Sequence, residues 1–464
     1  MSDRALDPAM LLPPPPASVH FMGLGGIGVS GLAAVLLERG YRVSGCDLAT
    51  SALTESLRAR GAAVYQGHDP AHLVGVDLLV ITAAVPPSNP EFAAARAAGL
   101  PVLKRAALLG ALLRPLKTIV VAGTHGKTTT SALIATVLLE AGLDPTAFVG
   151  GEVPALGSNA RVGRGAWAVA EGDEYDRSFL QLRPRVAVVT NVEHDHIDIY
   201  KDMAAVEDAF TRFIALLPPD GALIVCRDDP AALRLSASAP CRVVTYGLDG
   251  PADWAAADVA LNEGGAQFTL RRRDGSTQPV HTPLSGRHNV ANALAALAAS
   301  YEAGVSPATV SHVLEGAQGP RRRQEVKGHA FGGALIVDDY AHHPTEIAAT
   351  LAGLRARYPN RRLRVAYQPH TYSRTRLLLS ETGASLRLAD EVAVTEIYAA
   401  RETDTLGVSG QDVVAATNVA GGHATLTPSV ADAAAWLSLD ARADVVLVTM
   451  GAGDIWRAGE TVRA

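Results

Sequence analysis

Short apolar runs alternate with longer Ala- and Leu-rich segments of helical periodicity along most of the chain. Continuous apolar strands separated by helices form parallel sheets that helices cover on both faces. The pattern therefore predicts an α/β protein. The apolar runs with the length of a buried strand cover residues 19–22, 42–45, 78–82, 118–122, 167–170, 186–190, 222–226, 334–337, 363–367, 391–395 and 445–449.

Two seams interrupt this alternation. One lies at residues 113–116, just before a second glycine-rich turn, and the other at residues 316–323, after a long Ala-rich helical segment. They predict a flexible tail at 1–17 and three domains of ordinary size at 18–114, 115–319 and 320–464. Within the middle domain, residues 227–285 carry fewer helix signals and predict an antiparallel β insertion.

Composition narrows the class of protein. A chain of 464 residues is too long to fold around a single hydrophobic core, so we expect several domains. A content of 48% hydrophobic and 19% charged residues is typical of a globular protein. A net charge of −6 gives no reason to expect nucleic acid or a membrane as partner. The three cysteines stand far apart, which argues against a disulfide framework and against a zinc site. We find no signal peptide and no spanning segment, so we expect a cytoplasmic protein.

The first glycine-rich turn follows the apolar run at 19–22. It reads Gly23-Leu-Gly-Gly-Ile-Gly28, a helical pattern follows, and the next apolar stretch ends in Asp47. This is the order of a dinucleotide-binding βαβ unit, in which backbone amides approach a diphosphate. Taken alone, the motif suggests a nicotinamide-dependent dehydrogenase.

The second glycine-rich turn is the more specific motif. A strand runs into Gly123-Thr-His-Gly126-Lys127-Thr128-Thr129 and then into an amphipathic helix. Such a turn gathers backbone N–H groups around phosphate oxygens, with a lysine for the β- and γ-phosphates and a hydroxyl for Mg²⁺. Val121 stands where the full phosphate-loop motif has glycine, so this is a shortened variant.

Polar side chains follow the next two strands of the middle domain. Glu171 comes directly after one strand, and the other is followed by a cluster in which either histidine, with His194 the weaker candidate, is a possible ligand. Oxygen ligands with one imidazole suit Mg²⁺ bound to a nucleotide. The members of that cluster are Asn191, Glu193, His194, Asp195, His196 and Asp198.

A helix pattern opens with His288 and Asn289 and carries Asn292 one turn later. An asparagine here either caps the helix or reads an adenine edge, and the pattern leaves both open.

The last third has polar clusters after neighbouring strands, and the cations among them suggest recognition of a carboxylate or an acyl phosphate. The clusters are Asp338, Asp339, Tyr340, His342 and His343; His370, Tyr372, Arg374 and Arg376; and the turn at 451–453 with Asp454.

Six of these stretches, in order, resemble the Mur ligases of peptidoglycan synthesis. They are G-L-G-G-I-G-V-S-G-L-A at 23–33, G-T-H-G-K-T-T-T at 123–130, T-N-V-E-H-D-H-I-D at 190–198, G-R-H-N-V-A-N-A at 286–293, D-D-Y-A-H-H-P-T-E at 338–346 and Q-P-H-T-Y-S-R-T-R at 368–376. The stretches G-G-I-G-V-S-G-L-A and H-H-P-T-E resemble the alanine-adding members in particular.

The resemblance implies a Rossmann-like UDP-binding domain, a P-loop ATPase domain and a Rossmann-like C-terminal domain for the amino acid. It also implies an amide ligase. ATP would phosphorylate the lactyl carboxylate of UDP-N-acetylmuramate, and the amine of L-alanine would displace phosphate from the acyl phosphate. We expect a monomer or weak homodimer, with neither nucleic acid nor membrane as partner.

The resemblance further implies a role for each candidate residue. Lys127, His196, His342 and Arg374 would be catalytic, and Thr128, Glu171 and His196 would hold Mg²⁺. UDP would lie on Gly25, Gly26, Ile27, Gly28 and Asp47, and the lactyl and alanine groups on His342, His370 and Arg374. ATP would contact Gly123, Thr124, His125, Gly126, Lys127, Thr128, Thr129, His288, Asn292, Arg322, Asp339 and Tyr340.

Two positions depart from the family pattern. Thr371 stands where some relatives have an arginine, which leaves Arg374, alone or with Arg376, for the alanine carboxylate. Related ligases use a carbamylated lysine, for which Lys201 is an unconvincing candidate. The base for the alanine amine stays open between His342 and the phosphate itself.

Three alternatives compete with this ligase. A recycling ligase would attach a tripeptide to the same nucleotide sugar. A dehydrogenase would leave the loop at 123–129 unexplained, and a non-catalytic nucleotide switch would leave the histidines and arginines of the last domain unexplained.

Overall fold

The computed structural model describes residues 12–196, 199–400 and 402–463. The candidate ligand Asp198 and residues 1–11 of the predicted tail lie outside these ranges. The chain divides into two compact units. The first contains the described residues within 1–255, 271–276 and 292–313, and the second contains those within 256–270, 277–291 and 314–464.

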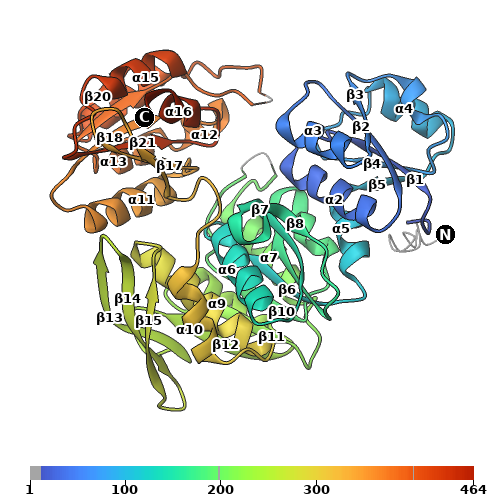
Figure 1. Cartoon of the computed structure of the whole chain (residues 1–464), viewed down its shortest axis with the longest axis horizontal. Helices are drawn as coiled ribbons and strands as arrows, with labels where there is room; N and C mark the ends of the chain where they lie inside the picture. The colour runs from blue at the N-terminus through green and yellow to red at the C-terminus, as the bar shows by residue number, and fades with distance from the viewer. Residues whose placement is uncertain (1–11, 197–198, 401, 464) are drawn as a thin grey trace. The chain divides into compact units, whose positions relative to one another are not determined.

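The first sheet has the strand order β3-β2-β1-β4-β5, and all of its neighbouring strands pair in parallel. Its chain order is β1 (Ser18–Met22), α2 (Ile27–Glu38), β2 (Arg42–Asp47), α3 (Ala52–Ala59), β3 (Ala63–Gln66), η1 (Pro70–Leu73), β4 (Leu78–Ile81), α4 (Pro90–Ala97), β5 (Val102–Lys104) and α5 (Arg105–Leu113). The chain reverses direction of winding beside β1, which is where open α/β sheets bind ligands. This sheet is drawn in blue in Figure 1.

Both faces of the first sheet are covered, as the continuous apolar strands predict. Phe21 and Val43 point to the face covered by α2, α3 and α5, where Leu32, Leu57 and Leu108 pack. Met22 and Cys46 point to the opposite face, where α4 and η1 lie. The two faces follow from the alternation of side chains along a strand.

The second sheet has the order β15-β14-β13-β12-β11-β10-β6-β9-β7-β8. Its strands are β6 (Lys117–Ala122), β7 (Thr146–Val153), β8 (Ser158–Arg161), β9 (Trp167–Gly172), β10 (Val186–Val189), β11 (Ala222–Cys226), β12 (Arg242–Gly247), β13 (Trp254–Asn262), β14 (Gly265–Arg272) and β15 (Thr277–Thr282). Its helices are α6 (Lys127–Glu140), η2 (Pro154–Leu156), η3 (Tyr175–Gln181), α7 (Met203–Ile214), α8 (Pro230–Leu235), η4 (Ser236–Ser238), α9 (Arg287–Glu302) and α10 (Pro307–Gly316).

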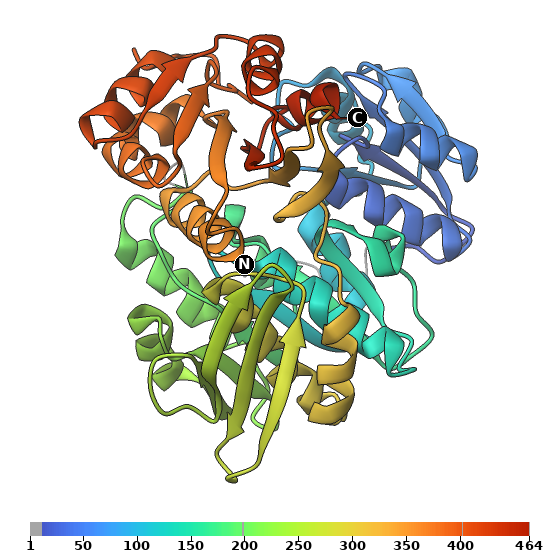
Figure 2. The ribbon, with the colours of Figure 1, turned by 60° about the vertical axis from the view of Figure 1, so that its left-hand side comes forward.

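The predicted antiparallel insertion is correct for only part of 227–285. Residues 254–282 form β13, β14 and β15, which Figure 2 shows as three adjacent strands. The links between them are too short for a parallel crossover, so these strands are antiparallel. Residues 227–247 instead contain α8 and β12, and β12 pairs in parallel with β11. The prediction was wrong there because the helical signal of α8 is only six residues long.

The third sheet has the order β16-β17-β21-β18-β19-β20; β16 pairs antiparallel with β17, and the other neighbouring strands pair in parallel. Its strands are β16 (Glu325–His329), β17 (Leu335–Asp339), β18 (Arg362–Tyr367), β19 (Glu391–Val394), β20 (Ala424–Leu426) and β21 (Val445–Met450). Its helices are α11 (Pro344–Arg357), α12 (Tyr372–Leu377), α13 (Leu379–Leu386), α14 (Gly410–Val419), α15 (Val430–Ser438) and α16 (Trp456–Val462). Helices α11, α13 and α14 cover one face, and α15 and α16 cover the other.

Each of the apolar runs singled out in the sequence is a strand, with bounds that differ by at most two residues. The α/β class and the three sheets are therefore confirmed. The boundaries at 114/115 and 319/320 fall between α5 and β6 and between α10 and β16, and they stay predictions. Across the described ranges, no helix combines the length and the apolar character needed to cross a membrane.

Candidate active site

The phosphate loop connects β6 to α6. Helix α6 begins at Lys127, and Gly126 precedes it with a left-handed φ of 82°. Gly123 also has a positive φ, of 136°, and a Cβ there would lie 2.0 Å from the hydroxyl oxygen of Thr190. Both glycines are needed because the turn combines left-handed backbone with close neighbours. The loop geometry is that of a strand–turn–helix phosphate cradle.

The end of β10 braces this loop. The backbone N–H of His125 donates to Asn191 Oδ1 at 2.8 Å, and the Thr190 hydroxyl donates to the His125 carbonyl at 2.6 Å. The Thr124 hydroxyl accepts from the backbone N–H of Glu193 at 2.8 Å. Asn191, a candidate metal ligand by sequence, thus acts on the loop backbone.

Lys127 is held by its own loop and by a carboxylate. Its Nζ donates to the carbonyl of Thr124 at 3.0 Å and to Glu174 Oε1 at 3.0 Å. Burial disfavours the charged amine, but the carboxylates of Glu174, Glu171 and Asp173 outweigh burial and raise the pKa of Lys127. The side chain is therefore a charged ammonium group, 13% exposed, that lies against the phosphate loop.

Thr128 and Glu171 meet, as the sequence predicts for a shared Mg²⁺. The Thr128 hydroxyl lies 3.0 Å from Glu171 Oε1, and the other carboxylate oxygen accepts from the Gly150 N–H at 2.6 Å. Glu171 is the penultimate residue of β9, and Thr128 lies in the first turn of α6, which follows the parallel neighbour β6. Both groups therefore lie at the same edge of the sheet.

His196 contacts a different carboxylate, which the sequence reasoning missed. Its Nε2 lies 3.6 Å from Glu174 Oε1, and Glu174 is buried. Burial lowers the pKa of His196, but the contacts with Glu174 and Asp195 outweigh burial and raise it. Glu174 stands three positions after Glu171 in the same acidic stretch, and that spacing was the available signal. His194 instead contacts the Tyr200 carbonyl at 2.9 Å.

Asn292 packs against the phosphate loop. Its Oδ1 accepts from the Thr130 hydroxyl at 3.1 Å, and a Cβ on Gly126 would lie 2.6 Å from the same oxygen. The buried amide therefore supports the start of α6, and adenine reading stays a prediction. The remaining loop residue predicted to touch ATP, Thr129, is buried.

The first glycine-rich turn is hydrogen-bonded to Asp47, the last residue of β2. The N–H of Gly25 donates to Asp47 Oδ2 at 2.8 Å, and Gly26 precedes helix α2. The Ile27 carbonyl accepts from the Asn159 side chain at 2.7 Å. The guanidinium of Arg105, which the sequence reasoning missed, would lie 3.1 Å from a Cβ on Gly28. Arg105 therefore places a cation beside the turn predicted to bind a diphosphate.

Arg322, in the second unit, is fixed by three groups of that unit. It contacts Asp338 Oδ2 at 3.0 Å and the carbonyls of Gly453 and Gly451 at 3.2 and 2.7 Å. Its guanidinium also lies 4.9 Å from the centre of the Tyr340 ring. To bind a phosphate of ATP, the Arg322 guanidinium would have to give up some of these contacts.

Two further candidates for ATP binding also have partners in the second unit. Asp339 accepts from the N–H groups of Gln324 and Ala341, at 2.7 and 2.8 Å, and burial raises its pKa to about 6. His288 Nε2 contacts the Gln324 side chain at 3.1 Å. Burial, with Arg323 nearby, lowers the pKa of His288 to about 4.

His342, His370 and Arg374 come together after β17 and β18. The rings of His342 and His370 lie 5.8 Å apart, and Arg374 donates to the His370 carbonyl at 3.1 Å. Burial lowers the pKa of His342 to about 3, with the cation of Arg374 adding to the effect. His342 is therefore neutral at pH 7.

The two departures from the family pattern have clear structural settings. The Thr371 hydroxyl donates to the Glu402 carboxylate at 2.8 Å, so Thr371 anchors the chain segment that carries Glu402. Arg376 donates to the Leu406 carbonyl at 3.4 Å. Lys201 is 85% exposed and pairs with Asp202, a setting that does not favour carbamylation.

Family models match nearly the whole chain in order. The Mur ligase family catalytic domain matches residues 18–116, the Mur ligase middle domain matches 121–300, and the Mur ligase glutamate ligase domain matches 322–453. Among curated relatives, the UDP-N-acetylmuramate–L-alanine ligase of Desulfosudis oleivorans is 42% identical over 96% of this chain and 97% of its own. The enzyme of the same name from Acetivibrio thermocellus is 41% identical over 95% and 94%.

Solved structures agree with the family models. The UDP-N-acetylmuramate–alanine ligase of Thermotoga maritima has a TM-score of 0.83 and 27% identity, covering 96% of this chain and 97% of that one. The murein peptide ligase of Psychrobacter arcticus has a TM-score of 0.75 and 26% identity, covering 97% and 100%. These likenesses do not favour the dehydrogenase suggested by the first glycine motif. The chain belongs to the Mur ligase family.

Proposed function

We propose that this chain is an ATP-dependent ligase that joins L-alanine to the lactyl carboxylate of UDP-N-acetylmuramate, in the cytoplasm, with release of ADP and phosphate. The observation that carries the proposal is the near-full-length identity of 42% to a relative of that name. The phosphate loop with its charged, partly buried Lys127 supplies the chemistry that such a ligase needs.

In phosphoryl transfer the protein mainly positions the reacting groups and stabilises the negative charge of the phosphates. Lys127 would spread the charge of the transferring γ-phosphoryl group, and the loop from Gly123 to Thr129 would hold the phosphates. In the present arrangement Glu174 compensates the charge of Lys127. The phosphates would take over that compensation when ATP binds.

The donors beside the loop fit Mg²⁺. The Thr128 hydroxyl and the Glu171 carboxylate form one oxygen pair, and Glu174 with His196 forms a second group of carboxylate and imidazole. When bound, Mg²⁺ would neutralise phosphate oxygens and the leaving ADP. We therefore add Glu174 to the ligands that the sequence predicted, Thr128, Glu171 and His196.

The acceptor side would use the C-terminal cluster. Arg374 would bind a carboxylate, with His370 beside it. His342 is neutral but has a pKa of about 3, which makes it a weak base at pH 7. This supports the phosphate oxygens as the acceptor of the alanine proton, with His342 donating to or orienting the carboxyl group.

The decisive experiment measures phosphate release from ATP. We expect release only when UDP-N-acetylmuramate and L-alanine are present together, and we expect Lys127→Ala to abolish it while binding of the nucleotide sugar persists. A folded protein that releases no phosphate with all three substrates would refute the proposal. Competition between L-alanine and the tripeptide L-alanyl-γ-D-glutamyl-diaminopimelate separates this ligase from a recycling ligase.

A further inference from the structure

A second cluster of side chains lies on the first sheet, on the face covered by α4 and η1. It consists of His20 on β1, Cys46 on β2, His72 in η1 and Glu91 in the first turn of α4. Strands β1 and β2 are adjacent, with Met22 opposite Cys46, and alternation puts His20 on the same face as Met22. The fold thus gathers four separate segments, and no role proposed above uses these side chains.

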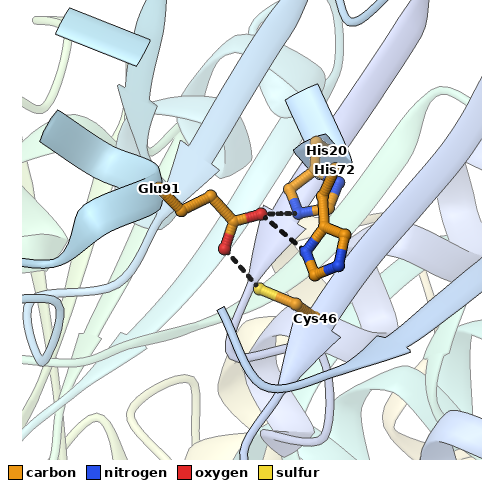
Figure 3. A group of neighbouring side chains, drawn as sticks. All are labelled: His20, Cys46, His72 and Glu91. Carbon is orange, nitrogen blue, oxygen red and sulfur yellow. Dashed lines mark hydrogen bonds and ion pairs between the residues drawn. The ribbon is translucent and has the colours of Figure 1, made fainter. Parts of the chain in front are cut away.

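Glu91 is the centre of the cluster, and Figure 3 shows the other three side chains converging on its carboxylate. His20 Nε2 and His72 Nδ1 lie 3.0 and 3.2 Å from Oε1, and Cys46 Sγ lies 3.1 Å from Oε2. One ligand atom from each residue lies within 4.8 Å of the other three. Ligands around a tetrahedral zinc ion stand about 3.3 to 3.8 Å apart, given bonds of about 2.0 to 2.3 Å. Small side-chain shifts would therefore surround an ion.

The environment of the cluster favours a cation. His20, Cys46 and Glu91 are fully buried. Burial removes the Glu91 carboxylate from water, and its oxygens face the side chains of His20, Cys46 and His72. A buried negative charge needs a positive partner.

The orientation of His20 gives an independent observation. Its Nδ1 lies 2.8 Å from the Ser44 hydroxyl, which turns Nε2 toward Glu91. Although Nε2 is 3.0 Å from a carboxylate oxygen, it forms no hydrogen bond of acceptable geometry with any described residue. A buried imidazole nitrogen without a hydrogen bond is uncommon in folded proteins. A metal ion between the two atoms would satisfy both, with Ser44 fixing the tautomer of the ring.

The donor types select the metal. One thiolate, two imidazoles and one carboxylate suit Zn²⁺, whereas Mg²⁺ and Ca²⁺ prefer oxygen ligands throughout. His68 places a third imidazole beside the cluster, because its Nδ1 lies 3.3 Å from Cys46 Sγ and 3.2 Å from Glu91 Oε2. This nitrogen donor also suits Zn²⁺ better than Mg²⁺ or Ca²⁺. The ring of Tyr65 stacks on His72 with centroids 4.2 Å apart and limits the movement of that ring.

We propose that His20, Cys46, His72 and Glu91 form a structural Zn²⁺ site in the N-terminal sheet. The carbonyl of Cys46 accepts from the N–H groups of Gly23 and Leu24, at 2.9 and 3.0 Å. The ion therefore fastens the strand end that carries the first glycine-rich turn. The wide spacing of the cysteines in the sequence excludes zinc sites built from cysteine pairs. It does not exclude a site with one cysteine, two histidines and a carboxylate.

The experiment uses the full chain, stripped with a chelator and then titrated with Zn²⁺ in excess Mg²⁺, which occupies the oxygen sites. We expect one zinc per chain by elemental analysis after desalting, and a rise in melting temperature that the chelator reverses. Cys46→Ser and His72→Gln should lower zinc affinity at least tenfold. Cys241→Ser, which removes a cysteine outside the cluster, should leave it unchanged.

Cobalt gives a readout specific to the thiolate. Bound Co²⁺ should show a sulfur-to-cobalt charge-transfer band in the wild-type chain and in Cys241→Ser, and none in Cys46→Ser. A wild-type chain that takes up cobalt without this band, or no zinc at all, overturns the proposal, as does full zinc retention in folded Cys46→Ser. If the variants do not fold, the wild-type band and its loss with chelator still decide. None of these outcomes depends on ligase activity.

Discussion

The two carboxylate oxygens of Glu174 lie 3.0 and 2.9 Å from the ammonium nitrogen of Lys127. Glu174 also approaches His196, so one buried carboxylate links the phosphate-loop cation to the histidine predicted to hold Mg²⁺. This link makes Glu174 the residue whose charge matters most to nucleotide binding in our proposal.

Glu174→Gln should lower turnover by about 100-fold and raise the Mg²⁺ concentration needed for half-maximal rate. An amide of the same shape neither ligates the ion as well nor balances Lys127. Phosphate release across a Mg²⁺ titration measures both effects. Glu207→Gln is the control, because Glu207 pairs with Arg234 on the surface helices α7 and α8. An identical Mg²⁺ dependence in the two variants would contradict the assignment.

Gly123→Ala should destabilise the chain by about 3 kcal/mol or more, or displace the phosphate loop. The new Cβ would meet Thr190 Oγ1 at 2.0 Å in a backbone with φ of 136°. Gly142→Ala is the matched control, since its φ is 76° and no atom lies within 4 Å of the new Cβ. That change should cost only about 1 to 2 kcal/mol. Thermal unfolding and ATP binding are the measurements, and equal effects would argue against the close approach.

Arg105→Ala should weaken binding of the nucleotide sugar about tenfold and leave ATP binding unchanged. The cation lies beside Gly28, whereas its neighbour Lys104 pairs with Asp176 at 2.8 Å and is 61% exposed. Lys104→Ala therefore serves as control and should have little effect. Calorimetric titration with UDP-N-acetylmuramate distinguishes the two. Equal losses in both variants would point to general charge rather than a specific contact.

Arg374→Lys should raise the KM for L-alanine about tenfold with little change in the KM for ATP, because an ammonium cannot reproduce a planar two-point contact with a carboxylate. Arg376→Lys should be nearly neutral, since the Arg376 guanidinium contacts a backbone carbonyl. Initial rates with each substrate varied in turn give the two constants. A larger effect from Arg376 would reverse the assignment.

His288→Gln should make stability less sensitive to acid. The ordinary histidine pKa is 6.5 and burial lowers that of His288 to about 4, so below pH 6.5 the unfolded chain binds a proton that the folded chain does not. The wild type therefore loses stability as the pH falls from 6.5 toward 4. The variant should lose roughly 1 to 2 kcal/mol less between pH 7.5 and 5. Urea unfolding at both values, with the exposed His423→Gln as control, tests this.

The eleven strands named from the sequence were predictable because their apolar runs are short, continuous and bounded by helices. β12 was not, because Arg242 and Thr245 break its apolar pattern and a six-residue helix precedes it. The edge strand β3 also escaped prediction, because its residues are mostly exposed.

The candidate site was predictable where residues stand at the carboxyl end of a strand, as Glu171 does at the end of β9. Glu174 was missed because it lies at the start of η3, beyond the strand end, where position in space depends on the turn. Arg105 opens α5, far in sequence from the turn that it approaches. The His20 cluster draws on residues 71 positions apart and has no local spacing to read.

The phosphate loop owes its shape to Thr190 and Asn191, which hold it through hydrogen bonds to the backbone of His125. The entropy of ordering the loop is therefore lost during folding and does not reduce the affinity for ATP. Association would then be a docking of two preformed surfaces, whose rate is set by diffusion and orientation rather than by rearrangement of the loop.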